Sequence, residues 1–151
     1  DPWEYYKEYE GDYKGYMDVV ITGLPDAEKV TRRRMIKYEN QVEIIKSFSS
    51  KCLTQIPDNL DFVYIDANHD YKFITEDMRN FWKKVRVGGI MGGHDYYNGY
   101  QRMCDDVIRA VGEFAYENKL QLRVETPDWW FVKKKWIVGR GRGRRGWGVD
   151  I

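Results

Sequence analysis

Apolar and polar positions alternate between strand-like and helix-like spacing along most of the chain. Short apolar runs rich in Val, Ile and aromatic residues predict strands, and apolar residues three or four positions apart predict helices. The predicted elements are a helix at 26–40, a strand at 42–46, a helical turn at 49–56, a strand at 60–65, a helix at 73–85, a strand around 90–91, a helix at 100–116, and strands at 120–125 and 129–133. Strands that alternate with helices predict an α/β fold, a Rossmann-like three-layer sandwich with a mostly parallel sheet and an antiparallel last strand.

Polar side chains gather where the predicted strands end. The strand at 60–65 is apolar almost throughout, as a strand covered on both faces should be, and it runs directly into Asp66. The following strand ends at His94 and Asp95. Ligands bind beyond the carboxyl ends of strands in open parallel sheets. If these two strands are neighbours about 5 Å apart, Asp66 and the His94–Asp95 pair converge on one point.

Two carboxylates and an imidazole suit a divalent cation such as Mg²⁺. Asp66, His94 and Asp95 are the predicted ligands, and they leave coordination positions for substrate and water. The same residues also suit metal-free chemistry, with His69 or His94 as the general base. Purely structural roles are the alternative. In that interpretation Asp70 starts the next helix, and His69 only holds its loop through hydrogen bonds.

Composition and length describe one soluble, globular domain. The chain has 151 residues, of which 42% are hydrophobic and 32% charged. No apolar run approaches the roughly 20 residues that span a bilayer, so no membrane partner is expected. Cys52 and Cys104 have no metal-site spacing, which indicates packing roles in a reducing, cytoplasmic compartment.

The charge pattern separates a body, residues 1–134, from a basic Gly/Arg-rich tail, residues 135–151. Seven Lys/Arg lie within 133–145, whereas the part before residue 131 has 18 basic and 23 acidic residues. This pattern argues against a nucleic-acid-binding domain and leaves weak polyanion contact through a flexible tail. The tail formally contains G-x-G-x-x-G at 141–146, but that pattern binds dinucleotides only where it opens a helix after a strand.

Paired motifs in residues 60–100 resemble class I S-adenosylmethionine-dependent methyltransferases, in the branch of small-molecule and sugar O-methyltransferases. The matching segments are IDANHDY at 65–71, an acid at Asp77 in the next helix, and GGIMGGHDY at 88–96. The closing PDWWFVK at 127–133 also resembles the last strand of that family. The resemblance extends over about residues 1–134.

The resemblance implies S-adenosylmethionine as cofactor and assigns several residues. Asp66 would lie beside the methyl-donor end of the cofactor and ligate a metal, with His94 and Asp95 at the other ligand positions. Ser49 matches a position that flanks the adenine, and Asp1 matches an acid that binds the ribose. The family's glycine-rich loop precedes that acid, so the chain is expected to be the C-terminal part of the domain, lacking the first strand-loop-helix unit.

The leading hypothesis is therefore methyl transfer from S-adenosylmethionine to an oxygen of a small molecule or sugar, with or without the assistance of a divalent metal. Asp66, His69 and His94 are the catalytic candidates, and Asp1, Ser49 and Asp66 the cofactor-binding ones. Two alternatives remain open. One is a non-catalytic methyltransferase-like fragment or binding module, and the other is a metal-dependent hydroxylase or hydrolase on the same scaffold.

Overall fold

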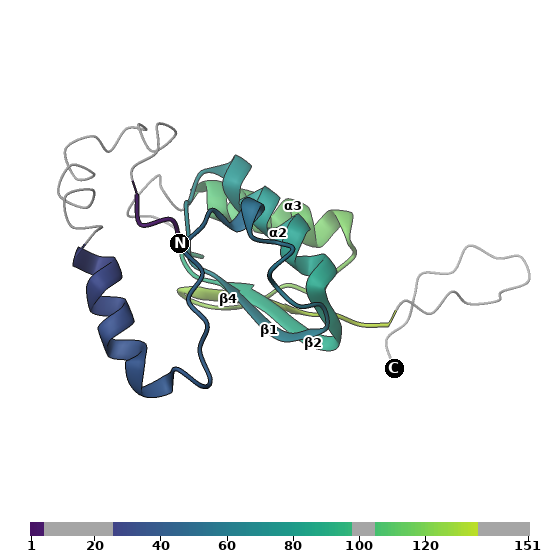
Figure 1. Ribbon diagram of the computed structural model, residues 1–151. Helices are drawn as coiled ribbons and strands as arrows, with labels where there is room; N and C mark the ends of the chain where they lie inside the picture. Colours follow the sequence, from purple (N-terminus) through teal and green to yellow (C-terminus); the bar gives the residue numbers. More distant parts are fainter. Residues whose placement is uncertain (5–25, 98–104, 136–151) are drawn as a thin grey trace, which may run out of the picture.

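The computed structural model describes residues 1–4, 26–97 and 105–135 (Figure 1). The prediction for the basic tail after residue 135 and the first residues of the helix predicted at 100–116 lie outside these ranges. The described elements, in chain order, are an α-helix at 26–35, short 3-10 helices at Ile36–Tyr38 and Ser49–Lys51, β1 (Leu60–Ile65), α2 (Tyr71–Lys84), β2 (Val85–Gly93), α3 (Asp105–Glu117), β3 (Arg123–Glu125) and β4 (Asp128–Val132).

The four described strands form one mixed sheet in the order β1-β2-β4-β3. β1 and β2 are parallel and are joined by α2, whereas β4 pairs antiparallel with both β2 and β3. The predicted α/β class and the antiparallel closing strand are confirmed. The sheet is mixed rather than mostly parallel, because only one of its three described pairings is parallel.

The core lies between the sheet and two helices. Figure 1 shows α2 and α3 over the same face of the sheet. Ile74 and Met78, one turn apart on α2, and Val107 and Val111, one turn apart on α3, are buried because i and i+4 side chains share one helical face. From the sheet, Trp129 and Phe131 alternate inward along β4 and pack with these helices as the largest fully buried side chains.

The expectation that residues 60–65 are covered on both faces is wrong for the described part of the chain. Ile65 is buried toward the helices, but Phe62 and Tyr64 point to the opposite face and are 57% and 46% exposed. No described helix lies over that second face (Figure 1). The sheet, α2 and α3 therefore account for two of the three expected layers within the described ranges.

Several predicted boundaries also change. Residues 42–46 form no strand, because an apolar run becomes a strand only with a hydrogen-bonded partner, and no described strand pairs with it. The helical turn is limited to Ser49–Lys51. The helix expected at 73–85 is α2, which ends at Lys84, and β2 begins at Val85 and is longer than the strand expected around 90–91. The strand expected at 120–125 is shortened to Arg123–Glu125.

Candidate functional site

The site begins where the parallel strands β1 and β2 end side by side. Ile65 is in register with Gly93, and the His94 amide donates a hydrogen bond to the Ile65 carbonyl at 3.1 Å. A side chain at position 93 would collide with that carbonyl oxygen and with the Trp129 ring, so only glycine allows this close approach. The residues that follow the two strands, Asp66 and His94, therefore start from the same edge of the sheet.

Asp95 is held in place mainly by its backbone. Its φ is 65°, a left-handed conformation that Asp adopts more readily than most residues. The carbonyl of His94 accepts a 3.1 Å hydrogen bond from the Trp129 indole, and the Tyr96 amide donates to the Pro127 carbonyl at 2.8 Å. These hydrogen bonds on both sides of Asp95 hold it in a backbone conformation that otherwise costs free energy. The result is a carboxylate in a residue only 8% exposed, fixed at the sheet edge.

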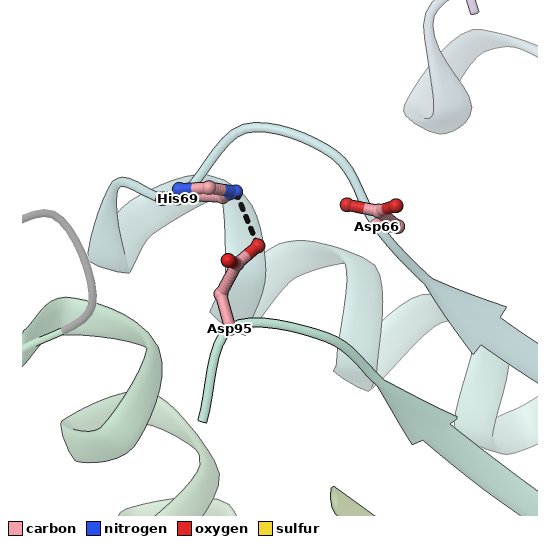
Figure 2. Close-up of side chains that lie close together, drawn as sticks. All are labelled: Asp66, His69 and Asp95. Carbon is pink, nitrogen blue, oxygen red and sulfur yellow. Dashed lines mark ion pairs between the residues drawn. The ribbon is translucent and has the colours of Figure 1, made fainter. Parts of the chain in front are cut away.

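His69 reaches this carboxylate from the loop between β1 and α2. The Asn68 side chain accepts a 2.8 Å hydrogen bond from the Asp70 amide, which turns the chain just before α2 begins at Tyr71. His69 Nε2 then lies 2.8 Å from Asp95 Oδ2, and the dashed line in Figure 2 marks this ion pair. A buried carboxylate is thus paired with an imidazole that is itself partly exposed, an arrangement that can hold or transfer a proton.

Asp66, His69 and Asp95 form a group that can hold a metal ion. One ligand atom from each residue lies within 4.8 Å of the others. Figure 2 shows the three side chains meeting from the end of β1, the following loop and the end of β2. Asp66 is exposed, His69 intermediate and Asp95 buried, so the group opens to solvent on the Asp66 side. A ligand can enter from there.

The two histidines have different positions. His94 Nδ1 lies 3.2 Å from Asp95 Oδ1, but His94 is outside the three-residue group. The predicted metal set was Asp66, His94 and Asp95. The structure brings the two acids of that set together and places His69, predicted only as a catalytic base, beside them. Asp70 is the N-cap residue of α2, as expected, although its side chain makes no capping hydrogen bond.

The sheet edge carries a negative field. The hydrogen bond that Tyr64 donates to Asp128, at 2.5 Å, together with partial burial raises the pKa of Tyr64 to about 12. The charges of Asp128, Asp66 and Asp95 contribute to this rise, because each opposes a second negative charge nearby. A cation between these carboxylates would relieve that repulsion.

The predicted cofactor residues Asp1 and Ser49 lie on neighbouring segments. The amino group of Asp1 donates to the Ile45 carbonyl at 3.5 Å, four residues before Ser49. The Ser49 hydroxyl donates a 2.6 Å hydrogen bond to the Asp77 carboxylate of α2. Asp1 itself is exposed, and its carboxylate accepts from the Trp3 amide at 2.7 Å.

Asp77 was not among the predicted site residues, although it is the other buried carboxylate of the described chain. Only 7% of it is exposed, and burial raises its pKa, partly offset by the Ser49 hydrogen bond. The sequence contains a signal for it. Asp77 lies next to Met78 and three residues after Ile74, on the apolar face of α2, where an unpaired acid is costly.

Sequence comparison identifies the family. A family model described as a methyltransferase domain matches residues 3–96, which include β1, α2, β2 and all three residues of the metal-competent group. The chain belongs to this methyltransferase family. No curated protein matches the chain.

Solved structures share the fold of this chain. The O-methyltransferase NovP superposes with a TM-score of 0.63 at 21% identity, over 89% of this chain and 58% of NovP. A Corynebacterium glutamicum protein from a structural genomics programme superposes with a TM-score of 0.57 at 10% identity, over 78% of this chain and 59% of that protein. The chain therefore spans somewhat less than three fifths of the length of either neighbour.

Within the described ranges, no helix combines the length and the apolar composition needed to cross a membrane.

Proposed function

We propose that the protein transfers a methyl group from S-adenosylmethionine to an oxygen of a small molecule or sugar. The observation that carries this proposal is the convergence of Asp66, His69 and Asp95 at the carboxyl edge of the parallel strand pair, in a chain of the methyltransferase family. Ligands of open α/β sheets bind at this edge. The structural neighbour NovP is an O-methyltransferase, which supports the choice of an oxygen acceptor.

S-adenosylmethionine supplies an electrophilic methyl group. In the transfer, an acceptor oxygen bonds to the methyl carbon, the carbon–sulfur bond breaks, and S-adenosylhomocysteine leaves with the electron pair of that bond. The hydroxyl proton of the acceptor must pass to a base. His69 suits this role, because its Nε2 lies beside the buried Asp95 carboxylate, which would stabilise the imidazolium. Most of the rate gain would come from aligning donor and acceptor.

A divalent metal fits the Asp66, His69 and Asp95 group as an alternative to the His69 base, because an imidazole that ligates a metal has no lone pair left for the acceptor proton. Carboxylates suit Mg²⁺ and Mn²⁺, and an added imidazole extends the range to Fe²⁺ and Zn²⁺. Two ligands of one ion are separated by at most about 4.2 Å at ordinary bond lengths. His69 and Asp95 are already 2.8 Å apart, so the exposed Asp66 is the side chain that would have to adjust to reduce the present spread of up to 4.8 Å. When bound, the metal would lower the pKa of an acceptor hydroxyl and orient it.

The His69–Asp95 contact also supports a metal-free form of the same reaction. A 2.8 Å pairing with a buried carboxylate fixes the imidazole tautomer and orientation without any ion. His94, whose Nδ1 contacts the other oxygen of Asp95, is the second candidate base. Removal of metal separates these forms, because a histidine base alone would keep working in the presence of a chelator.

The donor would bind beside Asp1 and Ser49. Asp1 would face the ribose and Ser49 the adenine, with Asp66 at the methyl end of the cofactor. The support for this placement is that Asp1 contacts Ile45, shortly before Ser49, and that Ser49 is tied to the helix that follows the Asp66 loop. Asp66 and Ser49 are thereby connected through α2.

Calorimetric titration of the full-length gene product with S-adenosylmethionine and S-adenosylhomocysteine tests the proposal. We expect binding of both, followed by transfer of a labelled methyl group to members of a panel of diols, catechols and sugars. Absence of binding at about millimolar cofactor, a free energy weaker than about −4 kcal/mol, would contradict the function. Metal binding without cofactor affinity would instead favour a hydrolase or hydroxylase on this scaffold.

A further inference from the structure

Asp77 controls the direction of the Ser49 hydroxyl. An ionised carboxylate has no hydrogen to donate, so the single Ser49 hydroxyl hydrogen must occupy the 2.6 Å contact between the two residues. Ser49 Oγ is then left with lone pairs alone for any other partner. The half-buried serine therefore presents an acceptor, and no donor, to whatever lies beside it.

The Ser49 segment has little freedom to escape this arrangement. Its carbonyl accepts hydrogen bonds from both the amide and the thiol of Cys52, each at 3.4 Å. The Lys51 amide donates to the Phe48 carbonyl at 3.0 Å, which closes the 3-10 turn. Asp77 is fixed in turn by its place on the buried face of α2, between the core residues Ile74 and Met78.

An ionised carboxylate at this buried position lowers the stability of the folded protein. The same loss of solvation raises the pKa of Asp77. The negative charge of the exposed Glu76 also raises this pKa. A neutral asparagine or an apolar residue would avoid the desolvation cost and still fill the space. The carboxylate of Asp77 differs from asparagine and from an apolar residue in one property: it can only accept, so the Ser49 hydroxyl must donate to it.

We propose that Asp77 is a specificity-determining positioning residue, which orients Ser49 as a hydrogen-bond acceptor for the exocyclic amine of the cofactor's adenine. This inference rests on the proposed function, because it assumes that Ser49 lies at the base of S-adenosylmethionine. The inference predicts which nucleoside part of the cofactor the protein binds more tightly. A base with an amine at position 6 donates to Ser49, whereas a base with a carbonyl there sets two lone pairs against each other and leaves a polar group unsatisfied.

The test compares S-adenosylhomocysteine with S-inosylhomocysteine, which differ in the group at position 6 of the base. Dissociation constants are measured by calorimetry at about pH 8, well above the usual range of carboxyl groups. The variants are Asp77→Asn, Ser49→Ala and the matched control Glu76→Gln, which removes the neighbouring exposed charge. The readout is the ratio of the two constants within one protein, because a merely structural loss weakens both ligands alike.

We expect the unmodified protein and Glu76→Gln to prefer the adenosyl compound about ten- to a hundredfold, the equivalent of one lost buried hydrogen bond. Asp77→Asn should reduce the preference to about threefold or less, because an amide can either donate or accept and frees the Ser49 hydroxyl to turn. Ser49→Ala should also reduce the preference to about threefold or less. It provides the test if the Asp77→Asn protein does not fold.

Two results would overturn the inference while leaving the proposed function standing: an unchanged ratio in Asp77→Asn, or an unchanged ratio in Ser49→Ala. If neither compound binds the unmodified protein, the proposed function fails, and the inference fails with it.

Discussion

His69 Nε2 lies 2.8 Å from Asp95 Oδ2, although 25 positions of sequence, containing all of α2, separate the two residues. The contact joins the loop after β1 to the end of β2 (Figure 2). Asp95 is buried and fixed by neighbouring backbone bonds, whereas Asp66 across the group is exposed. One side of the site is thus rigid and the other adjustable, which suits a centre that admits ligands from the Asp66 side.

The first prediction concerns metal affinity. Asp95→Asn and Asp66→Asn should each weaken Mn²⁺ binding at least about tenfold, because each removes a charged ligand atom from the group. Mn²⁺ binding can be followed by electron paramagnetic resonance or calorimetry. Asp70→Asn is the matched control, since it neutralises an acid of the same loop that lies outside the group.

Equal affinity in Asp95→Asn and the unmodified protein would rule out the proposed metal group. If the unmodified protein binds no metal, and a chelator leaves methyl transfer intact, the metal-free form of the mechanism holds.

The second prediction separates the two histidines. His69→Gln should lower the rate of methyl transfer about 10²- to 10⁴-fold, the usual contribution of a positioned acid or base, while S-adenosylhomocysteine still binds. His94→Gln should cost less than tenfold, because His94 touches Asp95 but is not part of the three-residue group. The measurement is a single-turnover rate at saturating cofactor. A larger loss in His94→Gln than in His69→Gln would reverse the assignment of the base.

The sequence predicted the two acids of the group for a physical reason. A carboxylate directly after an apolar strand must lie at the strand end, and parallel strands joined by one helix present those ends together. Asp66 and Asp95 follow from this rule, and the in-register pairing of Ile65 with Gly93 confirms the geometry.

The choice between the histidines was beyond the sequence. His69 reaches Asp95 because the chain turns at Asn68 and because Asp95 adopts a positive φ. Both are properties of irregular backbone, which apolar periodicity does not describe. The contact of Asp77 with Ser49 was not predicted either, because the two residues come from separate segments and only the folded chain brings them together.

The run at 42–46 shows a further reason for failure. Its apolar residues suit a strand, but strand formation depends on a partner elsewhere in the molecule, and no described strand supplies one. For the same reason, the apolar pattern of β1 did not reveal that Phe62 and Tyr64 lie on a face with no described helix over it.

The third prediction tests the close approach of the two strand ends. Gly93→Ala should destabilise the fold by about 1–3 kcal/mol and weaken metal binding, because the added methyl group meets the Ile65 carbonyl and the Trp129 ring. Gly112→Ala is the matched control. It lies in α3 with open space around the new methyl group, and it should stabilise the helix by about 0.5–1 kcal/mol.

Chemical denaturation gives both values, and metal titration of the Gly93→Ala protein gives the affinity. Unchanged metal affinity in a folded Gly93→Ala protein would show that the spacing of the strand ends does not control the site.

The last prediction concerns the pH dependence of stability that Asp77 causes. Burial raises its pKa in the folded state, so the folded protein binds more protons at this position than the unfolded chain does. Its contribution to stability is therefore fully present below the ordinary Asp value and is lost as the pH rises through the raised folded pKa. Asp77→Asn removes this dependence. The free energy of unfolding of Asp77→Asn minus that of the unmodified protein should increase through this window and then stay constant, as urea denaturation at a series of pH values would show. A difference that falls as the pH rises would mean that the folded protein favours the charged form of Asp77, contrary to its burial.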